Sequence, residues 1–360
     1  SALNKSIQVT GLWETTFIKF CLRLSTLWVA ISYFRSFRKA VRALRHLVSY
    51  RKSLQGDKGP LKYAKAHGKY HLSLNMPAWP SKAWFAFLRN ELSRLDPMGT
   101  ANTHIQTMVF TVTKQCSLSC EHCFEWENLN QPESLSLNDL KHVLDKFQKN
   151  GLSQVQISGG EPLRRIDDVL QLVEDSPKTS EFWLLSSGVG LTLSVAKGLK
   201  KAGFNGVNLS LDHWIEAQHN QFRGNDESYN WVMKAARNVV QADLQLCLSL
   251  CATREFTTLE NLWRYAELSR ELNAGIVQIL EPRASGRYAN TDVELTGVQV
   301  EMLRDFYLSM NTERVNRSYP LFQYPGYHQR KYGCFGAGLR FLYMDPCGNL
   351  HACPFCRNPM

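Results

Sequence analysis

The chain has 360 residues, of which 44% are hydrophobic, 11% aromatic and 21% charged. This composition excludes a disordered, collagenous or low-complexity chain, because it supplies enough apolar side chains for a sizeable core. The net charge is +10, but fourteen of the 42 lysines and arginines, and only two of the 32 acids, lie in residues 1–70. The basic charge therefore belongs to an N-terminal arm. The remaining chain is close to neutral, which argues against a nucleic-acid groove, and we expect no nucleic-acid partner.

The arm, residues 7–54, combines aromatic, apolar and basic side chains. Apolar residues recur at helical steps from Phe34 to Val48, and arginines follow the same steps one residue later, from Arg35 to Arg45. This pattern predicts an amphipathic helix that lies in a membrane interface. A helix packed on the body with a solvated arginine face, or an arm that binds nucleic acid, would have the same charges. The longest uncharged run, 24–34, has eleven residues. A span needs about 20, so we expect no transmembrane helix.

After a helix predicted over 81–95 with Ser81 as its N-cap, strands and helices alternate from residue 105. The predicted strands are 105–112, 155–158, 182–186, 206–211, 244–252 and 276–280, and the predicted helices are 137–149, 167–174, 193–202, 229–241, 259–272 and 297–310. Six such units predict an α/β fold whose parallel sheet curls into a partial (β/α)6 barrel, an incomplete TIM barrel. In folds of this kind the chemistry lies on loops at the carboxyl ends of the strands.

The loop after the first predicted strand contains Cys116, Cys120 and Cys123, spaced by three and two residues. Three thiolates at this spacing fit around one metal centre on a short loop. Structural zinc sites have four ligands, and cubane iron–sulfur clusters are also normally held by four thiolates. Three cysteines therefore imply a metal position that is left open for a ligand other than the protein.

The second predicted strand is followed by Ser-Gly-Gly-Glu-Pro, residues 158–162. Together with the Cys-x3-Cys-x2-Cys loop, this segment resembles the radical S-adenosylmethionine (SAM) superfamily, which has the cysteine motif after the first strand of a partial barrel and a GGEP motif after the second. The resemblance implies a [4Fe–4S] cluster on Cys116, Cys120 and Cys123, with S-adenosylmethionine bound next to it. It also implies that Gly159, Gly160 and Glu161 hold the methionyl amine.

Four further positions agree with the family more weakly, and the resemblance implies that each binds the cofactor. His122 stands where the family usually has an aromatic residue, Ser187 and Ser210 follow or end the third and fourth strands, and Arg223 would pair with the cofactor carboxylate. The two serines are equally explained as hydroxyls that satisfy turns, and Arg223 as a member of a surface ion pair. No catalytic acid or base is assigned, although Glu125, Glu127, Asp212 and Glu281 follow or end predicted strands.

The C-terminal segment contains four more cysteines, Cys334, Cys347, Cys353 and Cys356. Their spacing resembles the opening of the SPASM extension of radical SAM enzymes, which implies an auxiliary [4Fe–4S] cluster, in an extension that is either short or truncated. A zinc site with four thiolates is the alternative. A hairpin of 341–343 and 350–352 is expected between these cysteines. The expected organisation is a basic helical region over 1–100, a radical SAM barrel over 101–318 and a small cysteine-rich extension over 319–360.

The resemblance implies an enzyme that reductively cleaves S-adenosylmethionine to a 5′-deoxyadenosyl radical, which abstracts hydrogen from an unactivated carbon of a peptide or protein. The same chemistry on a membrane lipid or isoprenoid is one alternative, and a zinc-stabilised binding protein without enzymatic activity is another. The expected partners are a flavodoxin- or ferredoxin-type reductant, the substrate, and a membrane surface contacted through residues 7–54. The expected location is the cytoplasm, with a peripheral contact to the inner face of the membrane.

Overall fold

A computed structural model describes residues 7–55, 62–95, 104–334 and 336–356 of the chain. Its centre is a curved, open sheet of nine strands in the order β10-β9-β8-β7-β6-β5-β4-β11-β12. Every neighbouring pair is parallel except β11 and β12, which form an antiparallel hairpin. The strand bounds are β4 Thr107–Thr111, β5 Gln154–Ser158, β6 Glu181–Ser186, β7 Phe204–Ser210, β8 Gln245–Cys251, β9 Ile276–Leu280, β10 Leu321–Gln323, β11 Phe341–Met344 and β12 Leu350–His351.

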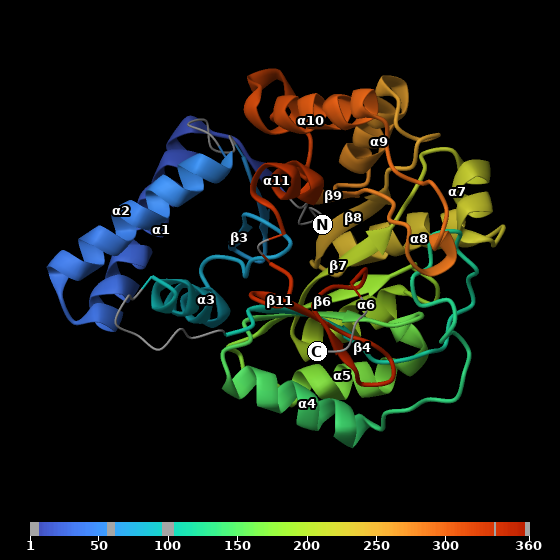
Figure 1. Ribbon diagram of the computed structural model, residues 1–360, viewed down its shortest axis with the longest axis horizontal. Helices are drawn as coiled ribbons and strands as arrows, with labels where there is room; N and C mark the ends of the chain where they lie inside the picture. Colours follow the sequence, from blue (N-terminus) through green and yellow to red (C-terminus); the bar gives the residue numbers. More distant parts are fainter. Residues whose placement is uncertain (1–6, 56–61, 96–103, 335, 357–360) are drawn as a thin grey trace.

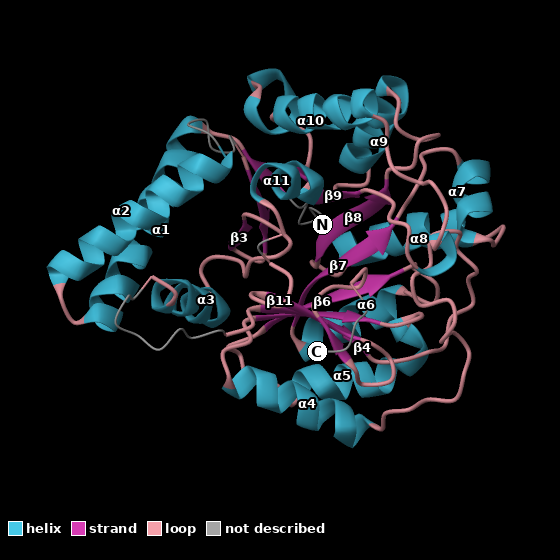
Figure 2. Cartoon of the chain, in the orientation of Figure 1, coloured by secondary structure: helices cyan, strands magenta, loops and turns pink. Residues whose placement is uncertain are grey.

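Helices cover the outside of this sheet (Figure 2). They are α4 Leu137–Lys149, α5 Ile166–Glu174, α6 Leu193–Ala202, α7 Glu216–Arg223, α8 Ser228–Gln241, α9 Leu259–Glu271, α10 Gly297–Thr312 and α11 Pro325–Tyr332. Alternate strand residues such as Val155, Ile157 and Leu248 form the large apolar core with them. Their neighbours in sequence, such as Gln156 and Asn208, are buried polar residues outside that core. The period of two residues separates the two faces of each strand.

The predicted partial barrel is confirmed. All six predicted strands are present, and the six helices predicted between and after them also form, each to within two residues of its expected ends. Polar N-caps explain part of this accuracy: Ser136 caps α4 in a full capping box, and Thr192 caps α6. Three strands of the predicted extension belong to the same sheet, because β10 pairs with β9, β11 pairs with β4, and β12 pairs with β11. The division at residue 319 stays a prediction, and the boundary near residue 100 lies outside the described residues.

The N-terminal region forms a helical hairpin and a small antiparallel sheet. The hairpin is α1 Leu12–Phe34 with α2 Phe37–Gln55, the sheet is β1 Ile7–Val9, β2 Tyr63–Ala66 and β3 Lys69–His71, and α3 Lys82–Ser93 follows. The hairpin lies beside the barrel, at the left of Figure 1.

The amphipathic helix expected from Phe34 onward is present as α2, but it begins only at Phe37, because Phe34 ends α1 and Arg35 adopts a left-handed φ of 49°. Ala40 and Ala43 are its buried residues, and they form one apolar cluster with Val29 and Ala30 of α1. Small side chains allow the two helices to approach closely. Phe37, in contrast, is exposed, as are the four predicted arginines from Arg35 to Arg45.

The expectation of no membrane-spanning helix rested on the eleven-residue uncharged run. In the structure that run is part of α1, which has 23 residues and is long and apolar enough, by length and composition alone, to cross a membrane. Little of α1 is buried inside the protein.

The turn after β3 closes the amino end of the barrel. Leu74 is fully buried against Trp183, Cys247 and Ile276. The ring of His71 packs edge-on against Trp183 at 5.7 Å between centroids. His71 is 1% exposed, and neither of its ring nitrogens has a hydrogen-bond partner among the residues that the structure describes. Burial, aided by the charge of Lys69, lowers the pKa of His71 from 6.5 to about 3.

This burial predicts a pH-dependent stability that the substitution His71→Phe removes. The unfolded chain takes up a proton on His71 below pH 6.5, whereas the folded protein resists protonation until about pH 3. The contribution of His71 to the free energy of unfolding therefore falls with falling pH, by about 1.4 kcal/mol per pH unit in this window. Urea unfolding from pH 7 to pH 4 should show a shallower decline for His71→Phe than for the wild type. His46→Phe, on the exposed side of α2, is the control. Parallel curves for wild type and His71→Phe would contradict the assignment.

Candidate active site

The predicted metal loop follows β4 at the carboxyl edge of the sheet. Cys120 is buried, and Cys116 and Cys123 are partly buried. Burial raises the pKa of Cys116 and of Cys123 to about 11, and the neighbouring thiol of Cys120 contributes to both shifts. The three thiols therefore lie close enough to affect one another, and binding of a cation would have to displace their protons. Among the described residues, no group of three or more His, Cys, Asp or Glu side chains is placed to hold a metal ion.

The Gly-Gly-Glu segment after β5 lies directly against this loop. The N–H of Gly160 donates to the carbonyl of Thr113 at 2.8 Å, and the N–H of Glu161 donates to that of Gln115 at 2.7 Å. A Cβ atom at Gly160 would lie 2.5 Å from the carbonyl oxygen of Gln115 and 2.9 Å from the Cβ of Cys116. A Cβ at Gly159 would lie 2.7 Å from the Cγ2 of Thr113. Both glycines are therefore required for contact between the two loops.

Two other loops hold the cysteine loop from different sides. The N–H groups of Ser119 and Glu121 donate to carbonyl oxygens at the end of α7, and Gly224 has a φ of +63° and lies against Ser119. After β9, Gly286 packs on the backbone of residues 123 and 124, and the N–H of Arg287 donates to the carbonyl of Cys123 at 3.1 Å. The position of the three thiols is thus fixed from three strand ends.

Arg223 is buried beneath the cysteine loop, so it does not form the surface ion pair considered above. Its Nε donates to Oδ2 of Asp212 at 2.6 Å, and its Nη1 lies 3.6 Å from the Sγ of Cys120. Burial is the largest single effect, and it opposes the charge on both groups. The opposite charges of the pair, together with neighbouring charges and hydrogen bonds, outweigh burial, so the pKa of Asp212 is lowered and the pKa of Arg223 is raised. No spacing in the sequence predicts this pair. Asp212 also accepts the N–H of Cys251 at 2.9 Å.

His122 stacks on Phe222, with ring centroids 4.7 Å apart and an angle of 19° between the planes. Burial and the charge of Arg223 lower the pKa of His122 to about 4. The ring is therefore neutral at neutral pH and lies on the end of α7 next to Cys123. A second buried imidazole, His219, accepts the N–H of Asp212 at 3.1 Å.

Glu161 connects the carboxyl ends of β5 and β6. It is 1% exposed, and its carboxylate accepts from the hydroxyl of Ser186 at 2.8 Å and from the N–H and hydroxyl of Ser187 at 2.8 and 2.6 Å. Burial raises the pKa of Glu161, while these hydrogen bonds oppose the rise. The Ser187 hydroxyl thus satisfies Glu161 in this structure. Ser210, at the end of β7, is only partly buried. Roles of these residues in cofactor binding stay predictions.

The cysteines of the tail do not all come together. Burial raises the pKa of Cys353, and the nearby thiols of Cys356 and Cys334 add to this rise. The backbones of residues 353 and 356 form an isolated antiparallel β-bridge. The Sγ of Cys347, in contrast, lies 3.9 Å from the hydroxyl of Ser134. The expected hairpin is confirmed as β11 and β12, and Asp345 fixes its turn by accepting the N–H groups of Cys347 and Asn349 at 2.9 Å.

Most carboxylates near the site are occupied by bonds within the chain. Glu125 is bonded to Tyr343 and to Asn128, and Glu281 is bonded to Tyr324 and Arg330. Asp212 is paired with Arg223, which leaves Glu127 exposed among the candidates. The geometry therefore selects no catalytic acid or base.

Comparison with known proteins identifies the domain. Residues 110–267 match the family described as the radical SAM superfamily. The mycofactocin maturase MftC of Mycolicibacterium smegmatis is 27% identical over 256 residues, which cover 69% of this chain and 64% of that protein. The matched region thus spans less than two thirds of the relative's length. The PqqA peptide cyclase of Gluconobacter oxydans is 27% identical over 255 residues, 69% of each chain.

Solved structures agree on the fold. SuiB of Streptococcus suis, in its complex with the precursor peptide SuiA, matches with a TM-score of 0.58 at 15% identity, covering 88% of this chain and 73% of that one. The structure of SuiB bound to S-adenosylmethionine gives the same TM-score.

The contact between the two loops predicts a specific defect for Gly160→Ala. The added methyl group would clash with backbone atoms of Gln115, which cannot move independently of the cysteine loop. We expect the free energy of unfolding to fall by about 1–3 kcal/mol, and iron retained after anaerobic reconstitution to fall with it. Gly297→Ala is the control, since nothing lies within 4 Å of its added Cβ. Equal stability and equal iron content in the two variants would refute the close contact.

Proposed function

We propose that this chain, whose residues 110–267 match the radical SAM superfamily, is an enzyme of that kind. It would cleave S-adenosylmethionine reductively and remove a hydrogen atom from an unactivated carbon of a peptide or protein. The observation that carries the proposal is the packing of the Cys116–Cys123 loop against the Gly159-Gly160 segment. This packing places three thiols with no fourth cysteine nearby in sequence, beside a backbone segment without side chains.

The donor set fits the cofactors that the family implies. Cys116, Cys120 and Cys123 would hold a [4Fe–4S] cluster and leave one iron open for S-adenosylmethionine. When bound and reduced, the cluster supplies the electron that splits the sulfonium into methionine and a 5′-deoxyadenosyl radical. Gly159 and Gly160 allow the cofactor to approach the backbone, and His122 covers the cluster loop from the side of α7. Glu161, Ser187, Ser210 and Arg223 would surround the cofactor.

The proposal has three further parts: the electron donor, an auxiliary cluster and the substrate class. The electron would come from a flavodoxin- or ferredoxin-type protein. Cys334, Cys353 and Cys356 would hold an auxiliary cluster together with Cys347, once the side chain of Cys347 has moved away from Ser134. The peptide substrate is favoured because similar proteins are a peptide cyclase and an enzyme solved with its precursor peptide. A lipid or isoprenoid substrate, or a zinc-binding protein without activity, are the competing proposals.

The cysteine loop provides the direct test of this function. Replacing Cys116, Cys120 and Cys123 together by Ala should abolish the formation of 5′-deoxyadenosine from S-adenosylmethionine and dithionite, measured by chromatography of anaerobic reactions. Cys21→Ala, on the N-terminal helix, should retain the wild-type rate and serves as the control. Residual 5′-deoxyadenosine in the triple variant would refute the assignment, and stoichiometric zinc without iron or sulfide in the purified wild type would favour the binding protein.

We further propose that the N-terminal hairpin holds the protein at an anionic membrane surface on the cytoplasmic side. Six large apolar residues of α1 recur every three or four positions and are at least 39% exposed: Trp13, Phe17, Phe20, Leu24, Trp28 and Ile31. This spacing places them on one face of the helix. The adjacent α2 has six lysines and arginines and no acid. Each basic residue near an anionic surface contributes about 1 kcal/mol. The same charges would repel a second copy of the hairpin.

The exposed face predicts binding to vesicles that depends on these aromatic residues. The variant Trp13→Ser/Phe17→Ser/Trp28→Ser should lose co-sedimentation with vesicles of phosphatidylglycerol and phosphatidylcholine, while the wild type sediments with them. Trp126→Ser and Trp263→Ser, two exposed tryptophans outside the hairpin, are matched controls. No sedimentation of the wild type, or a concentration-dependent dimer that the triple variant abolishes, would contradict the membrane contact.

A further inference from the structure

The inner face of the barrel has a row of polar side chains that crosses four neighbouring strands. Ser210 of β7, Ser249 of β8, Gln278 of β9 and Gln323 of β10 are paired in register, each with the next. Their neighbours along the strands, such as Val277, belong to the apolar core between the sheet and the helices. Because side chains alternate between the two faces of a strand, the row points into the barrel.

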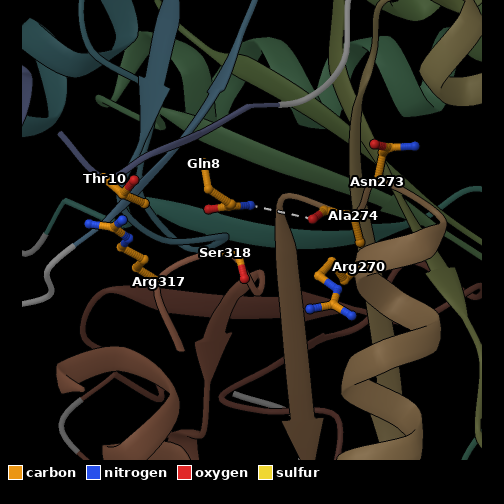
Figure 3. A pocket seen from close by; sticks show the side chains of 7 residues that line it. All are labelled: Gln8, Thr10, Arg270, Asn273, Ala274, Arg317 and Ser318. Carbon is orange, nitrogen blue, oxygen red and sulfur yellow. Dashed lines mark hydrogen bonds between the residues drawn. The ribbon is translucent and has the colours of Figure 1, made fainter. Parts of the chain in front are cut away.

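The barrel is closed directly below this row. Each member of the row is the first residue of its strand that is not buried. Two residues earlier on β8 and β9, Cys247 and Ile276 are fully buried against Leu74 and Trp183. The N-terminal sheet covers the same end from outside, where Gln8 of β1 donates to the turn that precedes β9 (Figure 3). A ligand that reaches the row therefore enters from the carboxyl end, where the cysteine loop lies.

Both glutamines of the row have their carboxamide oxygen bonded within the protein. The Oε1 of Gln278 accepts from the Nδ2 of Asn208 and from the hydroxyl of Ser249, each at 3.4 Å. The Oε1 of Gln323 accepts from the N–H of Leu74 at 3.1 Å, and a backbone N–H can only donate, so this amide is not reversed. In the part of the chain that the structure describes, neither Nε2 has an acceptor, and both Nε2 atoms keep accessible surface.

These two donors define the chemistry of a ligand at the bottom of the barrel. The row contains no ionisable side chain, so a charged group there would lose its hydration without gaining a partner. An isoprenoid or acyl chain would cover both donors and leave their hydrogen bonds unmade, which is costly. A neutral chain with repeated carbonyl oxygens satisfies them, because neighbouring strands are only about 4.8 Å apart and two oxygens of one chain can reach both donors.

We propose that Gln278 and Gln323 bind backbone carbonyl oxygens of the peptide substrate at the bottom of the barrel. The hydroxyl of Ser249 positions the amide of Gln278. The inference rests on the proposed function for the identity of the site, and it adds the residues that select a peptide over a lipid or isoprenoid. Ser210, at the other end of the row, belongs to the cofactor in that proposed function.

Binding is tested on the full chain with a neutral peptide probe, N-acetyl-tetraalanine N-methylamide. Calorimetric titration should show saturable binding, and Gln278→Met and Gln323→Met should each weaken it by about threefold to tenfold, the range expected for one neutral hydrogen bond. Methionine has a similar length but no donor. Gln241→Met, at the exposed end of α8, should bind the probe as the wild type does. Thermal unfolding of each variant without the probe establishes that it is folded.

A second measurement needs no substitution in the protein that binds the probe. In nuclear magnetic resonance spectra of the wild type labelled with ¹⁵N-glutamine, the tetrapeptide should shift the side-chain amide signals of Gln278 and Gln323 and leave that of Gln241 in place. Spectra of the three variants assign these signals.

The outcomes separate a peptide from the competing ligands. Absence of saturable binding by the wild type, equal affinity in the folded variants, or amide signals that do not shift would overturn the proposal. Farnesol that displaces the tetrapeptide, with the same affinity in wild type and variants, would assign the space to an apolar chain and also overturn it. These measurements need neither S-adenosylmethionine nor a reductant, so their failure is distinct from a failure of the radical chemistry.

Discussion

The close approach of the cysteine loop to the Gly159-Gly160 segment is the constraint on which the site depends. Two backbone hydrogen bonds join these loops, and positions for Cβ atoms between them are already filled by the backbone of Gln115 and by side-chain atoms of Thr113 and Cys116. A loop with three thiols is otherwise a flexible segment with no regular structure. Contacts at the ends of β5, α7 and β9 fix it, so the thiols are positioned by the sheet rather than by their own loop.

The buried pair of Asp212 and Arg223 supports the same loop from beneath. Its geometry is favourable, because the carboxylate of Asp212 also accepts the N–H of Cys251, and the guanidinium of Arg223 also contacts Cys120. Removing one partner of a buried pair leaves an unpaired charge and typically costs about 3–5 kcal/mol. The guanidinium of Arg223 also places a positive charge next to the Sγ of Cys120. One pair therefore contributes both to the fold around the loop and to the electrostatics of the proposed cluster site.

The barrel was predictable because its signals are local. Short apolar runs with polar caps predict the strands and helices, and the spacing of Cys116, Cys120 and Cys123 predicts the metal loop without any tertiary information. The pairing of Asp212 with Arg223, and of Glu161 with Ser186 and Ser187, could not be read from spacing, because these contacts exist only once neighbouring strand ends meet. The packing face of α2 could not be predicted from the sequence for another reason. The burial of Ala40 and Ala43 depends on α1, whereas the larger Phe37 dominates the sequence pattern.

The proposed function depends most on a cluster at the cysteine loop that has three protein ligands and one open iron. Electron paramagnetic resonance of the anaerobically reconstituted and dithionite-reduced protein tests this most directly, with and without S-adenosylmethionine. The account predicts a [4Fe–4S]⁺ signal that changes when S-adenosylmethionine is added, and that is absent when Cys116, Cys120 and Cys123 are replaced but unaffected by the substitution Cys21→Ala. A signal from this loop that does not respond to S-adenosylmethionine, or the same response in the triple variant, would contradict it.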